Sequence, residues 1–367
     1  MRNSFNFPDI RNQFPAICQS GDGSLVYLDS AATAQKPSVV LDALQGYYRG
    51  GSANVHRGSH QLTASTTSSF EQARKTVADF IGANTKEVVW TRGATESLNL
   101  IAQTYARTNL KPGDEIIVSE LEHHANIVPW QLVAAQTGAR IVKWPVNPQS
   151  CTLDLDKFRS LLNANTRIVA VAHISNVTGT RNPIEDTIAL AHSAGAVVVI
   201  DGAQGIVHEK VDVKAMDADF YVFSGHKLFG PTGIGMLYGK QALLEAMPPW
   251  HGGGKMVERV SFDGTTFTRS PGKFEAGTPN IAGAMGLAAA VSWFSQLDLA
   301  GVEKHIQVLH QRLVTGVQAM EGVRIVGLQP GSSIVSLVVD GVHHQDLAML
   351  LDQQKIAVRS GNHCAIP

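Results

Sequence analysis

The sequence has 367 residues, of which 44% are hydrophobic and 17% are charged, and its formal net charge is −1. A chain of this length and composition can bury a large core and is long enough for two domains. Acidic and basic residues are interspersed, which excludes a basic face for nucleic acid and a polybasic segment for anionic membranes, so a small molecule is the expected partner.

The N-terminal residues 1–23 contain no continuous apolar stretch of the kind that forms the core of a signal peptide. The longest apolar runs, such as Ala194–Ile200, have the length of a strand and fall far short of the roughly 20 residues that a membrane helix needs. The cysteines Cys18, Cys151 and Cys364 form no CxxC motif, which favours free thiols in a reducing compartment. We therefore expect a cytoplasmic protein that does not bind membranes.

Short runs rich in valine and isoleucine alternate with longer segments of helical pattern in the first two thirds of the chain. The predicted strands are Glu87–Thr91, Glu115–Ser119, Arg140–Trp144, Arg167–Val171, Ala196–Ile200 and Phe220–Phe223. Apolar strands joined by helices predict an α/β fold with a mostly parallel sheet, in which ligands gather at the C-terminal ends of the strands.

A second group of elements follows residues 248–279, a Gly/Pro-rich region that we interpret as a structured excursion. Helices are predicted from Ile281 to about residue 296 and from Gly301 to Met320, and strands at Val323–Val326, Ile334–Val338 and Ile356–Val358. This pattern predicts a smaller α/β domain. The expected division is an N-terminal arm at 1–24 that joins the small domain, a large domain at 25–280 and the small domain at 281–367.

A lysine in an unusual place is the strongest local signal. Lys227 follows the strand Phe220–Phe223 directly, in the segment Ser224-Gly-His-Lys, and Asp201 ends the preceding strand. Alone, the lysine would be an ordinary surface residue and the aspartate a helix cap or turn residue. Pyridoxal 5'-phosphate (PLP) requires both, because a lysine amine forms its Schiff base and a carboxylate keeps its pyridine nitrogen protonated.

The cofactor's phosphate needs a site as well. Thr91-Arg-Gly-Ala-Thr95 lies between a strand and a predicted helix, where free N–H groups and the helix dipole favour an anion, although N-capping explains Thr95 equally well. Ser224 and His226 could complete this cradle. His123 and His124 follow the strand Glu115–Ser119, and one of them could stack on the ring while the other is structural.

Cys364 lies in Arg359-Ser-Gly-Asn-His-Cys, where glycine and polar neighbours predict an exposed loop and an accessible nucleophilic thiol. Cys18 and Cys151 lack such surroundings and are predicted to be small buried hydrophobes. We expect no metal site, because the 14 histidines form no HExxH and no i,i+4 pair beside an acidic ligand.

Taken together, these motifs resemble the group II cysteine desulfurases, with the closest likeness to the CsdA and SufS type within the PLP-dependent class V aminotransferases. The resemblance runs from about Phe14 to Pro367. It rests on the segments Tyr27–Ala32, Asn54–Gly58, Glu122–Trp130, Asp201–Gln204, Ser224–Lys227, Phe274–Asn280 and Arg359–Cys364.

The resemblance implies a fold type I PLP enzyme, a homodimer with a mostly parallel seven-stranded sheet in its large domain and a catalytic cysteine loop in its small domain. By the same resemblance, Lys227 matches the Schiff-base lysine, Asp201 the pyridinium partner and Gln204 the contact to the ring hydroxyl. His123 matches the stacking residue, and Asn176 matches a further contact to cofactor and substrate.

The remaining site residues are implied in the same way. Phosphate contacts fall on Ala94 through its backbone N–H, and on Thr95, Ser224 and His226. Thr278 resembles the residue that reaches the phosphate from the neighbouring subunit, and Arg359 resembles a contact to the substrate carboxylate.

The implied reaction converts L-cysteine to L-alanine. Lys227 would remove the α-proton, His123 would move protons, and the Cys364 thiolate would take the sulfur as a persulfide. A SufE- or CsdE-type protein would then accept the sulfur for iron-sulfur cluster assembly or a related thiolation.

Three departures from the family pattern stand out. Ala94 and Asn362 occupy positions where threonine and histidine are frequent, and the sequence stops at Pro367, whereas relatives continue through a further strand, helices and another carboxylate-binding arginine. We therefore expect a truncated chain, with weakened substrate binding if the polypeptide does end there. The alternatives left open are a selenocysteine lyase or another class V lyase, and a PLP-binding but inactive partner or scaffold chain.

Overall fold

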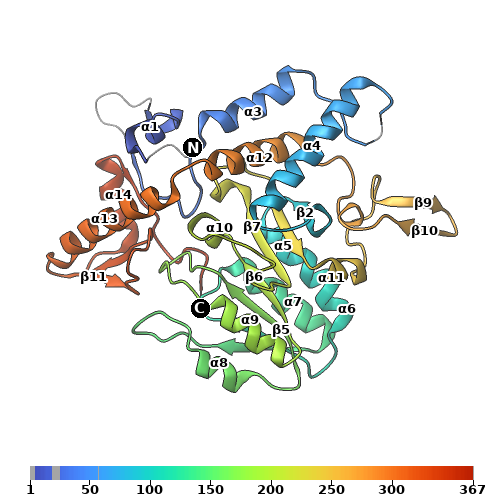
Figure 1. The fold of residues 1–367 in the computed structure, drawn as a ribbon. Coiled ribbons are helices and arrows are strands. Elements are labelled where there is room, and N and C mark those ends of the chain that lie inside the picture. Colours follow the sequence, from blue (N-terminus) through green and yellow to red (C-terminus); the bar gives the residue numbers. More distant parts are fainter. Residues whose placement is uncertain (1–4, 19–24, 57, 367) are drawn as a thin grey trace.

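The computed structural model describes residues 5–18, 25–56 and 58–366, and its centre is a twisted sheet with helices on both faces (Figure 1). Residues 1–4 and 19–24 of the predicted arm, as well as Arg57 and Pro367 of the segments that carry the resemblance, lie outside the described residues. The sheet has seven strands in the order β2-β8-β7-β6-β5-β3-β4. Their bounds are β2 (Val88–Thr91), β3 (Glu115–Ser119), β4 (Arg140–Trp144), β5 (Thr166–Ala172), β6 (Val197–Asp201), β7 (Phe220–Ser224) and β8 (Gly235–Gly239).

Strands β4, β3, β5, β6 and β7 run parallel, whereas β8 is antiparallel to both of its neighbours. The mostly parallel seven-stranded sheet predicted from the sequence is therefore confirmed. Six of its strands match predicted runs within one or two residues. β8 was not predicted, because glycines at both of its ends resemble a turn rather than a strand.

Both faces of the sheet are buried, which is why its strands are continuous apolar runs. In β5, Val169 and Val171 pack into one core cluster and Ile168 and Ala170 into another, and all four are fully buried. The first cluster is covered by α4 (Gln61–Phe80), α8 (Leu155–Leu161), α9 (Ile184–Ser193), α10 (Gly205–His208) and α12 (Ile281–Ser295). The second is covered by α5 (Ala94–Ile101), α7 (Val128–Thr137) and α11 (Gln241–Ala246).

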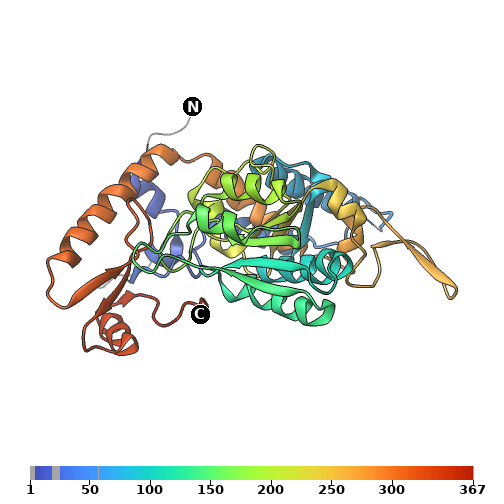
Figure 2. The same ribbon diagram turned by 90° about the horizontal axis from the view of Figure 1, so that it is seen from below.

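A smaller unit lies at one end of this core, drawn in orange and red (Figure 2). Its elements are α13 (Leu299–Gln318), the antiparallel pair β11 (Val323–Val326) and β12 (Ser336–Val339), α14 (His344–Gln353) and β13 (Ile356–Ala357). The N-terminal segment joins it, because β1 (Val26–Tyr27) pairs in parallel with β13 and the Phe5 and Phe7 rings lie 5.2 and 5.0 Å from the ring of His305.

Helix α12 packs with the large unit, and Ile281, Leu287 and Phe294 belong to the first core cluster. We therefore propose a domain boundary between α12 and α13, some residues after the predicted position at 281. Within the described residues 5–18, α1 (Phe7–Arg11) packs on the small unit through Phe7, whereas Phe14, just before α2 (Pro15–Cys18), packs against Phe229 and Trp293 of the large unit.

The Gly/Pro-rich excursion contains a hairpin that extends away from the rest of the chain (Figures 1 and 2). It consists of β9 (Val257–Ser261) and β10 (Gly264–Phe267). The remaining elements are α3 (Ser38–Arg49), α6 (Arg107–Asn109), the π-helix η2 (Ala102–Ala106) and the 3-10 turns η1 (Thr85–Glu87), η3 (His124–Asn126), η4 (Gly225–Lys227) and η5 (Gly272–Phe274). Over the part of the chain that the structure describes, no helix combines the length and the apolar character needed to cross a membrane.

Candidate active site

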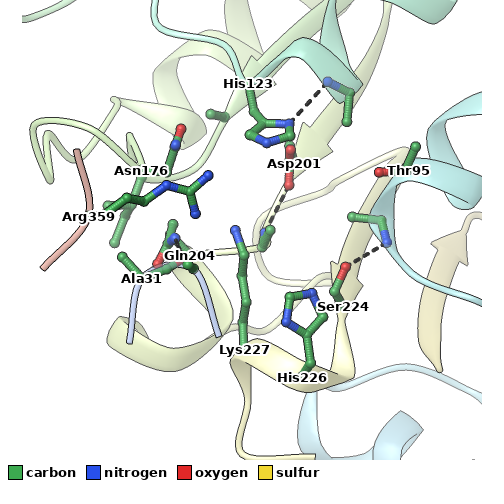
Figure 3. Close-up of a pocket in the computed structure, with 16 residues that line it drawn as sticks. Ala31, Thr95, His123, Asn176, Asp201, Gln204, Ser224, His226, Lys227 and Arg359 are labelled. Atoms are coloured by element: carbon green, nitrogen blue, oxygen red, sulfur yellow. Dashed lines mark hydrogen bonds between the residues drawn. The ribbon is translucent and has the colours of Figure 1, made fainter. Parts of the chain in front are cut away.

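A cavity of about 160 Å³ opens where the parallel strands end (Figure 3). Asp201 is the last residue of β6, Ser224 the last of β7, and Lys227 closes the turn η4 that follows. The structure brings together ten residues proposed from the sequence, which are Ala94, Thr95, His123, Asn176, Asp201, Gln204, Ser224, His226, Lys227 and Arg359. Its other lining residues are small or apolar, namely Ala31, Ala32, Ala125, Ala172, Ile174 and Ala203.

Lys227 lies deep in this cavity, and its amine and the Arg359 guanidinium both point into the open space (Figure 3). Burial lowers the pKa of Lys227, the negative charge of Asp201 partly opposes that shift, and the positive charge of Arg359 adds to it. Asp201 is itself buried, and its Oδ1 accepts a hydrogen bond of 2.9 Å from the Ala203 N–H. A carboxylate held in this way faces an amine that is more easily deprotonated than a surface lysine.

His123 covers the cavity from the side of β3 (Figure 3). Its Nδ1 accepts a hydrogen bond of 3.1 Å from the Ala125 N–H, which assigns the proton of the neutral ring to Nε2. Burial is the largest cause that lowers the pKa of His123. Burial therefore favours the neutral ring, in which the Nε2–H is available as a hydrogen-bond donor while Nδ1 keeps the bond that orients the ring.

The N-terminus of α5 meets the end of β7 at the far side of the cavity. The Ala94 N–H donates a 2.9 Å hydrogen bond to Ser224 Oγ. Strand β8 also comes close to this point and requires glycine there, because a Cβ on Gly235 would lie 2.5 Å from the Gly93 Cα. Backbone N–H groups at a helix N-terminus, a serine hydroxyl and Thr95 together provide the donors that bind a phosphate.

Glu122 braces the segment that carries His123, a role that sequence reasoning missed although the residue belongs to a quoted motif. Its carboxyl accepts hydrogen bonds from the Ala172 N–H at 2.7 Å, from Asn126 Nδ2 at 2.6 Å and from the Ser119 hydroxyl. Burial raises the pKa of Glu122 to about 8. These bonds connect the ends of β3 and β5 beneath the cavity.

Two further buried side chains support the floor of the site, and neither was predicted. His173 follows β5, and its Nδ1 lies 3.0 Å from the Tyr221 hydroxyl of β7. Burial lowers the pKa of His173 to about 4. The position of His173 at a strand end was an available signal, whereas Tyr221 lies inside β7 and gave none; neither residue stands in one of the segments that carry the resemblance.

The turn that carries His226 is held by the segment just after the quoted motif Tyr27–Ala32. The His226 carbonyl accepts hydrogen bonds from Lys36 Nζ at 3.0 Å and from the Ala34 N–H at 3.1 Å. Burial lowers the pKa of Lys36 to about 8. Lys36 was not predicted, because an isolated lysine in a loop gives no signal in the sequence.

Cys364 lies beside the cavity rather than inside it. Its Sγ is 3.8 Å from Arg359 Nη2, so one guanidinium contacts both the thiol and the cavity. The residue is exposed, as predicted, and lines an adjoining hollow of about 310 Å³.

Cys18 is also exposed, which corrects the prediction that it is buried: it lies on the surface in α2, with its thiol against the Arg11 carbonyl. Cys151 is half-buried.

Thr278 does not line either cavity. It is exposed and accepts a 3.2 Å hydrogen bond from Asn54 Nδ2. Among the described residues, no cluster of three or more histidine, cysteine or acidic side chains could hold a metal ion.

The cavity fits PLP in its chemistry. It has a carboxylate at its base, an amine at its side and anion donors at one end. Asp201 would hold the pyridine nitrogen, Lys227 the aldehyde carbon, and Ala94, Thr95 and Ser224 the phosphate.

Comparison with known proteins points in the same direction. Residues 26–367 match the family described as Aminotransferase class-V. A protein from Vibrio cholerae serotype O1 named probable cysteine desulfurase is 65% identical over 364 residues, which cover 99% of this chain and 90% of that protein.

Two solved structures share the fold over nearly the whole chain. The cysteine desulfurase CsdA from Escherichia coli has a TM-score of 0.91 and 49% identity, covering 99% of this chain and 90% of that one. The apo cysteine desulfurase from Thermococcus onnurineus NA1 has a TM-score of 0.94 and 38% identity, covering 100% of this chain and 90% of that one.

Proposed function

Because the chain belongs to the PLP-dependent class V aminotransferase family, and within it to the CsdA-like cysteine desulfurases, we propose that it holds PLP on Lys227 and moves sulfur from L-cysteine to Cys364. The observation that carries this proposal is the contact of one guanidinium with both parts of the site. Arg359 lines the cavity that contains Lys227 and Asp201, and its Nη2 lies 3.8 Å from Cys364 Sγ. A substrate carboxylate bound there would bring the cysteine side chain toward the thiol.

Each polar residue of the cavity has a task in this proposal. PLP, when bound, withdraws electrons from the substrate's Cα. Asp201 keeps the ring nitrogen protonated, and Ala94, Thr95, Ser224 and His226 hold the phosphate. Gln204 lines the same cavity, its Nε2 donates a 2.7 Å bond to the Ala31 carbonyl, and it would contact the ring hydroxyl.

Proton transfer falls to Lys227 and His123. The lowered pKa of Lys227 makes its amine easier to deprotonate than that of a surface lysine, and the free amine removes the proton from the substrate's Cα. His123 would stack over the site and move protons there, taking up a proton at Nδ1 as it releases the Ala125 N–H and giving one up from Nε2. Asn176 and Arg359 orient the substrate from the side of the cysteine loop.

Cys364 accepts the sulfur in this proposal. Its thiolate attacks the substrate sulfur, so that an S–S bond forms while the Cβ–S bond breaks. The electron pair of the broken bond stays with the carbon skeleton, which takes up protons and leaves as L-alanine. The enzyme keeps the sulfur as a persulfide on an exposed residue, where a second protein can remove it.

We also propose a homodimer in which Thr278 contributes to the phosphate site of the partner subunit. Thr278 is exposed and lies outside the cavity of its own subunit. Exposed apolar side chains on the nearby hairpin, Val260 at 64% and Phe262 fully exposed, give that face apolar surface to bury.

The proposed sulfur acceptor is a SufE- or CsdE-type protein that serves iron-sulfur cluster assembly or a related thiolation. A cytoplasmic location fits this role, because Cys18, Cys151 and Cys364 are all free thiols in the structure. The selenocysteine lyase and scaffold alternatives have no observation that favours them over desulfuration.

The decisive experiment incubates PLP-loaded protein of confirmed intact mass with L-cysteine and a reductant, and measures alanine and sulfide. A parallel sample without reductant is alkylated and mapped for the persulfide. Equal amounts of alanine and sulfide, with the persulfide on Cys364, are expected. Alanine without any persulfide on Cys364 would remove this thiol from the mechanism, and no alanine at all would contradict desulfuration.

A further inference from the structure

The turn that carries Cys364 has a constrained backbone. Two consecutive residues, His363 with φ of 51° and Cys364 with φ of 56°, adopt the left-handed conformation that residues other than glycine rarely enter. Such a conformation persists only where surrounding contacts hold it. The contacts of this turn therefore decide where the thiol points.

His124 supplies two of those contacts. Its backbone N–H donates a 2.7 Å hydrogen bond to the Cys364 carbonyl, and its ring Nε2 accepts a 3.0 Å hydrogen bond from the Ile366 N–H. On the other side of the turn, Asn176 Nδ2 donates a 2.9 Å bond to the His363 carbonyl.

We propose that His124 is a positioning residue that holds the Cys364 turn in its left-handed conformation through the ring bond to the Ile366 N–H. A ring nitrogen accepts only when it carries no proton, so this bond requires neutral His124 with its proton on Nδ1. The proposal rests on the proposed function, since it names what aims the thiol that receives the sulfur.

Because His124 directly follows His123, this bond connects the cysteine turn to the segment that lines the cofactor cavity. His123 faces the cofactor cavity, whereas the next residue reaches the cysteine turn, and His124 and Cys364 line the same adjoining hollow. The residue that stacks on the cofactor and the residue that aims the thiol thus lie in one short stretch, which Glu122 braces from below through Asn126 and Ala172. This arrangement fixes the thiol relative to the cofactor cavity as well as to the small unit.

Three substitutions separate the ring bond from the rest of the residue. His124→Gln retains a side-chain acceptor of similar reach, His124→Asn retains an amide that is too short, and His124→Leu removes the acceptor. The backbone bond to Cys364 survives in all three. His343→Leu is the matched control, because its ring also accepts a backbone N–H, from Gln345 at 3.3 Å, but at the start of α14.

The first measurement needs no turnover. Amide hydrogen exchange is followed on the peptide that covers residues 359–366, with PLP-loaded protein. We expect exchange at Ile366 to be about fivefold faster in His124→Leu and His124→Asn, the effect of one ordinary hydrogen bond, and to return within about twofold in His124→Gln. Unchanged exchange in both the Leu and the Asn variant, or no recovery in the Gln variant, would overturn the proposal.

The second measurement is the rate of persulfide formation on Cys364 in a single turnover with L-cysteine. The Leu and Asn variants should be about fivefold slower, with unchanged KM and unchanged visible spectrum, while the Gln variant and the His343 control keep the native rate. Native rates in the Leu and Asn variants would contradict a positioning role. If the unmodified enzyme forms no persulfide, the proposed function fails, and the exchange measurement still decides whether His124 holds the turn.

Discussion

At Lys227, burial and the neighbouring carboxylate of Asp201 shift the pKa of the amine in opposite directions. Burial lowers the pKa of Lys227 and the charge of Asp201 raises it, with burial the larger cause. The outcome is an amine with a lowered pKa, which favours its action first as a nucleophile and afterwards as a base. Neither property belongs to a lysine on the surface.

Lys227→Ala should abolish the covalent attachment of PLP and with it the visible absorption band of the lysine-bound cofactor, because no other lysine lines the cavity among the described residues. Borohydride reduction of the unmodified protein, followed by peptide mapping, should place the cofactor on Lys227. A modified peptide that contains Lys36 instead would show that the wrong buried lysine was assigned.

Cys364→Ser should retain the bound cofactor and its colour but form no persulfide, because a serine hydroxyl is not ionised at neutral pH and a thiolate is the nucleophile. Absorption spectra and persulfide mapping check the two halves of this prediction. Cys151→Ser is the matched control and should behave as the unmodified enzyme does. A persulfide that appears on Cys18 in the Cys364 variant would assign the sulfur to another thiol.

At the scale of elements, the site depends on how closely β6, β7 and α10 approach one another. Gly202 follows β6, and a Cβ at this position would lie 2.1 Å from the ring of Tyr221. Tyr221 is fully buried and contacts His173, so its ring has nowhere to move. The residue after Asp201 must therefore be glycine.

Gly202→Ala should lower the free energy of unfolding by about 1 to 3 kcal/mol through overpacking, and it should weaken PLP binding because Asp201 would shift with it. Chemical denaturation and PLP titration measure the two effects. Gly316→Ala in α13 is the control, since a Cβ there meets nothing within 4 Å, and it should stabilise the helix by about 0.5 to 1 kcal/mol. Equal stability of the two variants would refute the packing argument.

At the scale of the whole molecule, two neutral histidines, the buried His173 and the half-buried His208, make the free energy of unfolding depend on pH. Burial lowers the pKa values of His173 and His208 to about 4, below the ordinary value of 6.5. Between these pH values the unfolded chain binds more protons than the folded one, so stability is full above about pH 6.5 and is lost as the pH falls toward 4.

Each of these histidines should contribute up to about 1.4 kcal/mol of lost stability per pH unit in that window. His208→Gln should therefore flatten the fall in the free energy of unfolding between pH 6.5 and 4.5, relative to the unmodified protein. Urea unfolding at a series of pH values measures the slope. An unchanged slope would mean that His208 ionises freely in the folded state.

The sequence predicts the core of this molecule well, and for a physical reason. Parallel strands buried on both faces are long apolar runs, and the polar residues that follow them lie at one edge of the sheet. This rule predicts from the sequence that Asp201 and Lys227 lie close together. The same rule does not predict β8, because its terminal glycines resemble a turn. It does not predict the hairpin β9–β10 either, because most side chains of these two strands are exposed.

The residues that were missed in the site are of a different kind. The missed residues act through contacts between segments that are distant in the chain, such as the bond from Lys36 to the His226 carbonyl; they are Lys36, Glu122, His173 and Tyr221. The hydrophobic periodicity of a sequence does not predict which distant residues form such contacts. Cys18 was expected inside because cysteines usually are, and it lies outside because the short helix α2 presents it to solvent.

The pairing of β1 with β13 has a consequence for synthesis on the ribosome. Val26 pairs with Ile356, and a ribosome that adds about 5 to 20 residues per second takes roughly 15 to 65 s to deliver the second strand after the first. The seven-stranded sheet can form during that interval, since all of its strands lie between Val88 and Gly239. The N-terminal strand must wait for its partner, and Cys364 is synthesised after that partner, so the thiol cannot take its place until long after the strands of the sheet have been made.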